Sequence, residues 1–403
     1  MSIWGVIEPA ESVQTRLRLD FGLRPAILAL NEWAVPGLGG AFFVRQLTWG
    51  CLGIFLAEEM QRSSLAAQIA EGIEALASWI ALKYDEYEKD DRVQGKRKLR
   101  NLEAISFDAV SRGGAYVTVP FRRAATAALL GLGFCTSAQF RFNNLQLAPA
   151  GVELAGTVLR ENGVPEALRK WITQPTVALT QRRTLLAEAL LPGKVTSAEC
   201  HLVRNRLMAD PGRARIINLL EPLTDLRTDK DIAVFLRQVS DPVQRARLDA
   251  CFVFERVRAS ALQSAQTLVD AIQASAQSWS ALANANDVQQ AFQVLHEDCA
   301  VLATRLDKLA QVPAGIREFC DEQGPTLDLE RRIQALAIRL PQVFTMQPGS
   351  LDRGIGYTDS LVAADAMDPV AGETTPTNAL VPRPLLRLKR LYQETLEGIG
   401  HEA

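Results

Sequence analysis

The sequence predicts a mainly α-helical, multi-domain protein that contains a small helix–turn–helix unit with a hairpin and, further along, a long helical hairpin. Three observations support this fold class. Apolar residues recur at helical spacing over most of the 403 residues. Residues 106–159 alternate helix and turn signals over a short distance, and residues 262–279 carry one long apolar stripe. The length suits two or three domains.

The composition is that of an ordinary globular protein, with 48% hydrophobic and 22% charged residues and a formal net charge of −2. A protein that coats nucleic acid is strongly basic, so any DNA contact must come from a local patch. The six cysteines are far apart and form no CxxC pair, which favours buried, reduced thiols over disulfides or zinc ligands. Charged residues near the start argue against a secretory signal, and the apolar run 46–57 is too short to cross a bilayer. We therefore expect a cytoplasmic protein that does not bind membranes.

Residues 1–91 are expected to form an N-terminal helical domain. Pro25 opens an apolar helix, and the glycine-rich residues 35–40 form a turn before a second apolar helix. A third helix is predicted from about residue 64 to residue 84. It ends in the acidic run 85–91, which is expected to be a solvated helix end.

Residues 92–162 contain the helix–turn–helix unit. Ser106 is a suitable N-cap for a short helix that stops at Gly113-Gly114, where the sharp turn needs glycine. Pro120 stands near the first turn of a second helix, where proline costs no hydrogen bond. This second helix closes at Gly131-Leu132-Gly133.

A hairpin is predicted directly after the second helix. Polar and apolar residues alternate in Gln139–Phe142 as in a half-buried strand, and Leu145–Leu147 is the return strand. Asn143-Asn144 tolerates the left-handed backbone of a tight turn. Pro149 then starts another helix. This order of elements is that of a winged helix-turn-helix.

Residues 106–159 resemble the winged-helix domains of MarR-type bacterial regulators. In that family the second helix ends in LG(L/F), and the return strand passes into LTPxG before a helix. The matching residues here are Leu132-Gly133-Phe134 and Leu147–Gly151. Ala148 stands where the family usually has threonine, so the side-chain N-cap is absent, and Arg141 is the only cation of a short wing. The resemblance implies an embedded winged helix-turn-helix, a fold that usually binds duplex DNA.

The charge around this unit favours DNA binding, because eight cations and only two anions lie between residues 92 and 123. Cations that neutralise phosphates make binding salt-dependent. We expect Arg122 and Arg123 to reach base edges in the major groove. We expect Arg141 and Asn143 to contact the backbone beside it. The remaining candidate DNA ligands are Lys96, Arg97, Lys98, Arg100 and Arg112.

Two alternatives to DNA contact stay open for this region. The basic run Gly95–Lys98 is equally typical of a solvated loop between domains. Winged helices also serve as docking domains for proteins.

Residues 163–345 are expected to form a C-terminal helical domain around a long helical hairpin. Residues 284–287 contain a break with a new N-cap, and residues 288–310 form a helix that returns alongside the first. The stripe is interpreted as core packing, with a groove for a partner protein as the alternative. The stripe comprises Leu262, Ala265, Val269, Ile272, Ala276 and Trp279.

Residues 346–382 are rich in Gly, Pro, Thr and Asp and are interpreted as a flexible acidic linker. Residues 383–400 form a basic amphipathic helix tethered by this linker. We expect its apolar face to bind a partner protein or a second copy of the chain. The alternative is that the helix folds back onto its own domain. The residues of this face are Leu385, Leu388, Leu391 and Tyr392.

No catalytic, metal or cofactor site is predicted. The chain has only three histidines, the residue that supplies many metal ligands and general bases. Residues 35–40 lack the lysine of a phosphate-binding loop. We therefore expect a non-enzymatic, DNA-binding subunit of a bacterial regulatory, DNA-handling or defence complex, with double-stranded DNA as its partner and no cofactor. The alternative is a structural adaptor, similar to the kleisin-like subunits of ATPase machines, whose winged helix and C-terminal helix bind proteins.

Overall fold

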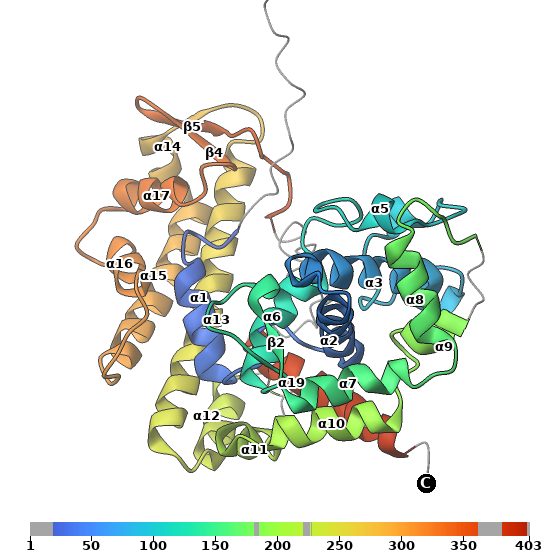
Figure 1. Ribbon diagram of the computed structural model, residues 1–403. Coiled ribbons are helices and arrows are strands. Elements are labelled where there is room, and N and C mark those ends of the chain that lie inside the picture. Colours follow the sequence, from blue (N-terminus) through green and yellow to red (C-terminus); the bar gives the residue numbers. More distant parts are fainter. Residues whose placement is uncertain (1–18, 181–184, 221–225, 227, 362–380, 401–403) are drawn as a thin grey trace, which may run out of the picture. The chain divides into compact units, whose positions relative to one another are not determined.

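The computed structural model describes residues 19–180, 185–220, 226, 228–361 and 381–400. The described chain is mainly α-helical, which confirms the expected fold class (Figure 1). It separates into two units. Unit 1 comprises residues 1–29 and 252–368, and unit 2 comprises residues 30–251 and 369–403. The expected boundaries after residues 91 and 162 both fall inside unit 2, because the helices on either side of them share one core.

The division passes through two helices, α1 (Arg24–Ala34) and α13 (Pro242–Ala271). None of the described helices is both long enough and apolar enough to cross a membrane.

Unit 2 is built around the buried helix α2. Three helices pack against it: α3 (Ala66–Ala81), α6 (Phe121–Gly131) and α7 (Pro149–Leu159). Helix α2 (Val44–Glu59) is buried along almost all of its length, including Trp49, because neighbouring helices pack around it. The prediction of a second apolar helix after residues 35–40 is confirmed.

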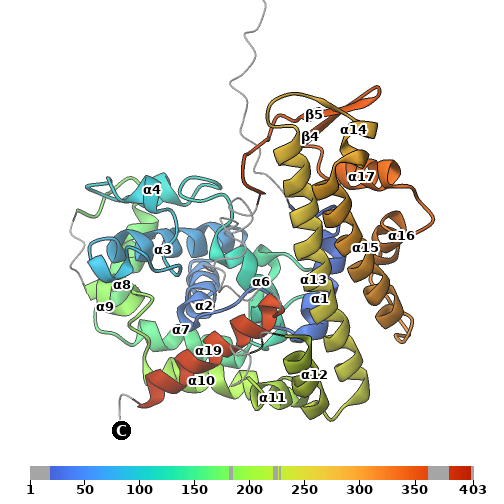
Figure 2. The same cartoon turned by 180° about the vertical axis from the view of Figure 1, so that it is seen from behind.

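The other helices of unit 2 surround this core (Figure 2). Two of them begin with a capping box, in which Thr196 and Glu199, and likewise Thr228 and Asp231, satisfy each other's backbone N–H groups. Their bounds are α4 (Lys96–Leu99), α5 (Phe107–Val110), α8 (Val164–Thr173), α9 (Leu185–Leu190), α10 (Ser197–Met208), α11 (Pro211–Ile217), α12 (Asp229–Gln238) and α19 (Arg383–Gly400). The described part of unit 2 also has three 3₁₀ turns: η1 (Ser63–Leu65), η2 (Asp85–Tyr87) and η3 (Phe142–Asn144).

The segment that resembles a winged helix has the expected order of elements, but its hairpin differs from the prediction. The two strands, β1 (Cys135–Thr136) and β2 (Gln146–Leu147), are antiparallel, with Cys135 opposite Leu147. The return strand is therefore in place, whereas the prediction of a strand at Gln139–Phe142 is wrong. Those residues belong to the hairpin loop, residues 137–145. Their alternating pattern has another cause, since Phe142 is buried as an anchor of the loop and Phe140 is exposed.

Unit 1 contains the predicted helical hairpin, made by α13 and α15 (Asn286–Leu306) (Figure 2). The Ser264 hydroxyl donates to the Ala291 carbonyl at 3.2 Å, and Arg256 pairs with Asp298 at 2.8 Å. The apolar stripe does not follow one helix to its end as expected, because α13 stops at Ala271. The polar residues that follow form a short strand, and the Ser278 hydroxyl there caps the next helix.

Among the described residues, the remaining elements of unit 1 are three helices and one antiparallel sheet with strand order β3-β5-β4. The linker prediction is wrong at its start, because residues 347–353 belong to the β4–β5 hairpin. This hairpin turns at Gly349, where φ is +83°, and buries Leu351. Residues 362–380 of the expected linker lie outside the described residues. The bounds are α14 (Trp279–Asn284), α16 (Ile316–Glu322), α17 (Leu329–Ile338), β3 (Gln277–Ser278), β4 (Phe344–Gln347) and β5 (Ser350–Arg353).

Candidate nucleic-acid interface

Helix α6, which is expected to read DNA, is covered on most of its surface. The glycine-rich turn before α2 packs tightly on it, and the Gly40 N–H donates to the Ala124 carbonyl at 3.0 Å. A Cβ at Gly40 would lie only 2.7 Å from that of Ala124, so the turn needs glycine there. Arg123 is the exposed residue of the first two turns of α6. A recognition helix needs a long free face to enter the major groove, and α6 offers only its N-terminal edge.

Arg122 points into the unit and not toward solvent. Its guanidinium pairs with Glu71 of α3 at 2.8 Å, and the two side chains are only 15% and 2% exposed. The same guanidinium lies 5.9 Å from the centre of the Phe142 ring. Arg122 therefore connects α6 to α3 and to the hairpin loop, a role that the sequence analysis did not give it.

Glu74 lies one turn from Glu71 on the same face of α3 and is fully buried. The Tyr116 hydroxyl donates to its carboxyl group at 2.9 Å. Burial raises the pKa of Glu74 to about 8, against the opposing effects of the Tyr116 hydrogen bond and of nearby Arg122, and neighbouring Glu71 raises it further. Burial also raises the pKa of Tyr116. At neutral pH Glu74 therefore keeps its proton, beside the ion pair of Glu71 and Arg122.

This cluster was not predicted from the sequence. The available signal was a pair of glutamates three residues apart, the two charged residues of their helix, since residues at that spacing share one face. Their partner Arg122 is 51 residues away in the chain, and nothing local indicates that contact.

The hairpin loop is held closed by its own polar side chains. The Ser137 hydroxyl donates to the Asn144 carbonyl at 3.0 Å, and the Asn144 amide donates to the Gln139 side chain at 2.8 Å. The Gln139 N–H in turn donates to the Ser137 hydroxyl at 3.1 Å. These bonds join the two ends of the loop across its base.

Two further contacts anchor the loop to the body of unit 2. Phe142 is buried beneath Arg122. The Asn143 side chain accepts a hydrogen bond from the Ala67 N–H at 2.8 Å, in the first turn of α3. Asn143 was expected to contact DNA, and it is instead occupied in capping this helix.

The anchored loop leaves Phe140 and Arg141 at its tip. Phe140 is 69% exposed, and Arg141 is exposed beside it. Because Arg122 contacts Phe142, the loop lies next to the N-terminal turn of α6, which carries Arg123. An exposed aromatic ring, two arginines and a closed loop are thus gathered at one edge of unit 2.

The other basic candidates are less available than their number suggests. Arg112 pairs with Asp108 at 2.7 Å and Arg100 with Glu88 at 2.8 Å. The ammonium group of Lys98 donates to two backbone carbonyls, those of Gly114 and Ala115, and that of Lys96 donates to the Glu88 carbonyl. Three exposed arginines among the candidate cations have neither an ion pair nor a side-chain hydrogen bond among the described contacts: Arg97, Arg123 and Arg141.

The C-terminal helix α19 folds back onto its own unit, which is the second of the two interpretations of the sequence. It packs against α10, and all three leucines of the expected binding face, Leu385, Leu388 and Leu391, are fully buried. Tyr392 is half-buried, with the Arg204 guanidinium 5.8 Å from its ring centre. The prediction that this face binds a partner is corrected, because it is already part of the core of unit 2.

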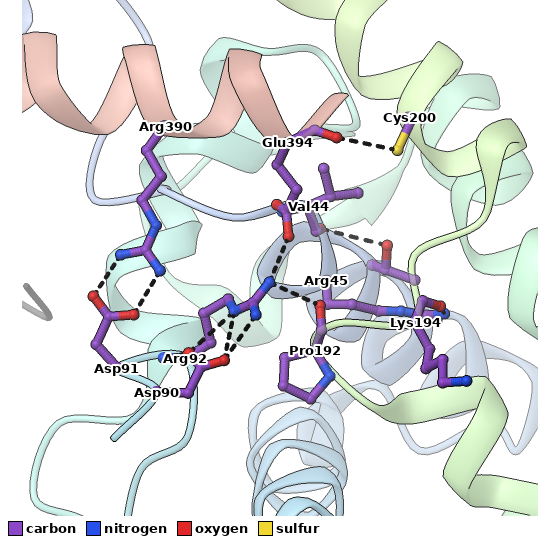
Figure 3. A network of polar contacts seen from close by, with 11 residues as sticks. Val44, Arg45, Asp90, Asp91, Arg92, Pro192, Lys194, Cys200, Arg390 and Glu394 are labelled. Atoms are coloured by element: carbon purple, nitrogen blue, oxygen red, sulfur yellow. Dashed lines mark hydrogen bonds and ion pairs between the residues drawn. The ribbon is translucent and has the colours of Figure 1, made fainter. Parts of the chain in front are cut away.

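Polar contacts complete the docking of α19 (Figure 3). Arg390 pairs with Asp91, and Glu394 pairs with Arg92 at 3.0 Å. The other carboxylate oxygen of Glu394 accepts the Val44 N–H at the start of α2 at 2.6 Å. The end of the acidic run is therefore a docking site for α19 and not a solvated helix end as expected.

Comparison with models of protein families, with characterised proteins and with solved structures found no match to this chain. Within the described ranges, no group of three or more histidine, cysteine or acidic side chains is placed to hold a metal ion.

Proposed function

We propose that this chain is a non-enzymatic DNA-binding subunit of a bacterial regulatory, DNA-handling or defence complex, and that it contacts duplex DNA with its hairpin loop. The tip residues Phe140 and Arg141 and the neighbouring Arg123 make the contact. One observation carries the proposal: Phe140 is 69% exposed at the tip of a loop that is hydrogen-bonded across its base and anchored to two helices.

The physical argument rests on preorganisation. A loop that is already ordered loses little conformational entropy when it binds. An arginine at the tip of such a loop can enter the minor groove, and an apolar side chain beside it can wedge between base steps. Arg123, at the edge of α6, is suited to a phosphate contact that fixes orientation. The proposal differs from the sequence interpretation in one respect, since α6 does not enter the major groove.

The test is binding of a random-sequence duplex by Arg123→Ala/Arg141→Ala over a series of salt concentrations. Loss of two cations, each of which would displace condensed counterions from the DNA, should lower the slope of log affinity against log salt by about 1.8 and weaken binding by about tenfold or more. Arg160→Ala, an exposed arginine at the end of α7, is the matched control and should bind like the wild-type chain. Unchanged affinity and slope in the double variant would exclude the proposed contact.

A second candidate function is a structural adaptor whose hairpin loop binds a protein. The specific observation in its favour is the covering of α6 by the glycine-rich turn and α2, which leaves little of a DNA-reading helix free. Phe140 would then be the anchor of a protein interface. The two functions differ in how strongly the binding affinity depends on salt concentration. Phe140→Ala would abolish partner capture, while no duplex binding would be measurable in the wild-type chain.

A further inference from the structure

Two buried thiols face each other across the contact between α15 and α16 in unit 1 (Figure 2). Cys299 lies on α15 and Cys320 on α16, and the two residues are only 1% and 5% exposed. Their side chains share a hydrogen bond. All six cysteines of the chain are free thiols, so this pair is reduced in the structure.

Polar contacts at both ends of the helix pair fix its direction. The Nδ1 atom of His296 on α15 lies 2.9 Å from the Gln323 carbonyl oxygen, directly after α16. At the other end, Arg317 in the first turn of α16 pairs with Asp307, directly after α15, at 2.7 Å. The two helices therefore run in opposite directions, and the residues between these two contacts face each other.

This register places the two cysteines opposite each other. Cys299 follows His296 by three residues on α15, and Cys320 precedes Gln323 by three residues on α16. Residues three apart share one face of a helix, so antiparallel helices that meet at His296 and Gln323 meet again at the two cysteines, one turn further on. The juxtaposition of the thiols thus follows from the packing of the helices.

Helix α16 is the part of this contact that can open locally, because it has seven residues and α15 has 21. Its contacts within unit 1 include Phe319, whose ring centre lies 6.1 Å from that of Phe21, and Glu322, which pairs with Arg339 at 2.6 Å. Short elements held by individual side chains open without unfolding of the whole domain. Such opening exposes Cys320 and uncovers Cys299.

We propose that Cys299 and Cys320 form a site of reversible oxidation, at which a peroxide converts the two thiols into a disulfide that fixes α16 on α15. Thiols that already share a hydrogen bond need only small side-chain rotations to reach disulfide geometry. The bond closes residues 299–320 into a covalent loop, which restricts separation of the two helices. The site lies in unit 1 and does not depend on the proposed function.

The reaction takes place in two steps. The closed pair is protected, because the hydrogen bond to Cys320 and burial raise the pKa of the Cys299 thiol and only a thiolate attacks peroxide. In the open state one thiol ionises and attacks an oxygen of hydrogen peroxide, which leaves a sulfenic acid and one water. When α16 returns, the second thiol attacks the sulfenic sulfur, the S–S bond forms, and a second water leaves. The two thiols lose two electrons and two protons, and one peroxide becomes two waters.

A second pair of thiols in the chain provides an internal comparison. Cys51 on α2 and Cys135 on β1 also share a hydrogen bond, and both are buried. Helix α2 is the central helix of unit 2, so exposure of Cys51 requires disruption of that core. Because local opening is more frequent than unfolding of a whole unit, the Cys299–Cys320 bond should form about tenfold faster or more.

The experiment treats the full folded chain with hydrogen peroxide and samples the reaction over time. Each sample is quenched with catalase, unfolded, alkylated with iodoacetamide and digested with trypsin. The two cysteines of the site then lie on separate peptides, residues 259–305 and 318–331. Mass spectrometry should find these peptides joined about tenfold earlier than residues 46–62 and 124–141, which carry the second pair.

Hydrogen exchange measures the effect of the bond on α16. The disulfide opposes separation of the helices, so exchange of the α16 amides should slow by about tenfold or more in the oxidised chain. Dithiothreitol reduces the bond and should restore the original exchange rate. The helices of unit 2 serve as the reference and should exchange at the same rate before and after oxidation.

Three variants test the assignment of the two residues. Cys299→Ser and Cys320→Ser should each abolish the joined peptides and the slowing of exchange. Cys251→Ser is the matched control, because the buried Cys251 thiol donates to the Leu30 carbonyl at 3.3 Å. It should form the joined peptides like the wild-type chain. Circular dichroism of each variant confirms that the helices remain folded.

Two results in the wild-type chain would overturn the proposal without any variant. If both cysteines of the site remain alkylated and unjoined after peroxide treatment, the facing thiols do not form a disulfide. If the two pairs join at the same rate, the bond forms only after general unfolding and the site has no special reactivity. Unchanged exchange of α16 after the bond has formed would contradict its role in fixing the helix. None of these readouts involves DNA.

Discussion

The C-terminal helix α19 and the hairpin loop of residues 137–145 both differ in exposure from what their sequences indicate. The apolar face of α19 is typical of a free binding helix, yet Leu385, Leu388 and Leu391 are fully buried in the core of unit 2. The loop has the alternating pattern of a half-buried strand, yet it leaves Phe140 69% exposed. The pattern of apolar residues alone therefore does not distinguish a surface that is free to bind a partner from one that is buried within the same chain.

Charge placement explains the difference. Helix α19 carries Arg390 and Glu394 at positions where unit 2 offers Asp91 and Arg92, so its polar side chains are matched within the chain (Figure 3). At the tip of the loop, Arg141 has no ion pair with any described residue. The matched charges indicate that α19 is structural, whereas the unmatched cation beside an exposed aromatic residue is the basis of the proposal that the loop binds a partner. On this account, α19 variants change stability and loop variants change binding.

The largest effect on stability is expected for Leu388→Ala. The side chain is fully buried, and removing it leaves a cavity, so the free energy of unfolding should fall by about 2–5 kcal/mol. Leu396→Ala, on the same helix but 40% exposed, should change it by less than about 0.5 kcal/mol. Urea denaturation measures both. Equal, small effects would mean that α19 does not belong to the core of unit 2.

A smaller loss is expected for Glu394→Gln, which tests the polar half of the docking. The amide cannot accept from both Val44 N–H and Arg92 as the carboxylate does, so we expect a loss of about 1.5–3 kcal/mol. Glu397→Gln on the exposed side of α19 is the control. If the two variants have the same stability, the charges do not distinguish α19 from a free helix.

The helices were largely predictable from the sequence, and the contacts between distant segments were not. Periodic apolar residues predict α2 and α3, because most of their length is buried against other helices. The pattern of Gln139–Phe142 covers only four residues, too few to tell a strand from a loop with one anchored ring. Residues 347–353 were interpreted as linker because their composition is polar, although a glycine turn and one buried leucine are enough for a hairpin.

The candidate site was predicted in part. Arg123 and Arg141 are exposed, and their contact with DNA stays a prediction. Arg122 is mostly buried, and the exposed Asn143 is hydrogen-bonded within the unit. The partner of Arg122 is Glu71, and that of Asn143 is the backbone of Ala67. Such contacts depend on tertiary packing, and a single sequence carries no local signal for them.

The central claim, that the hairpin loop is built for binding, is tested most directly by Phe140→Ala. An exposed side chain contributes little to folding, so the free energy of unfolding should change by less than about 0.5 kcal/mol. Affinity for a random-sequence duplex should nevertheless fall by about fivefold or more, because the proposed contact includes the Phe140 ring. Unchanged affinity, or a loss of stability that accounts for the loss of affinity, would contradict the claim.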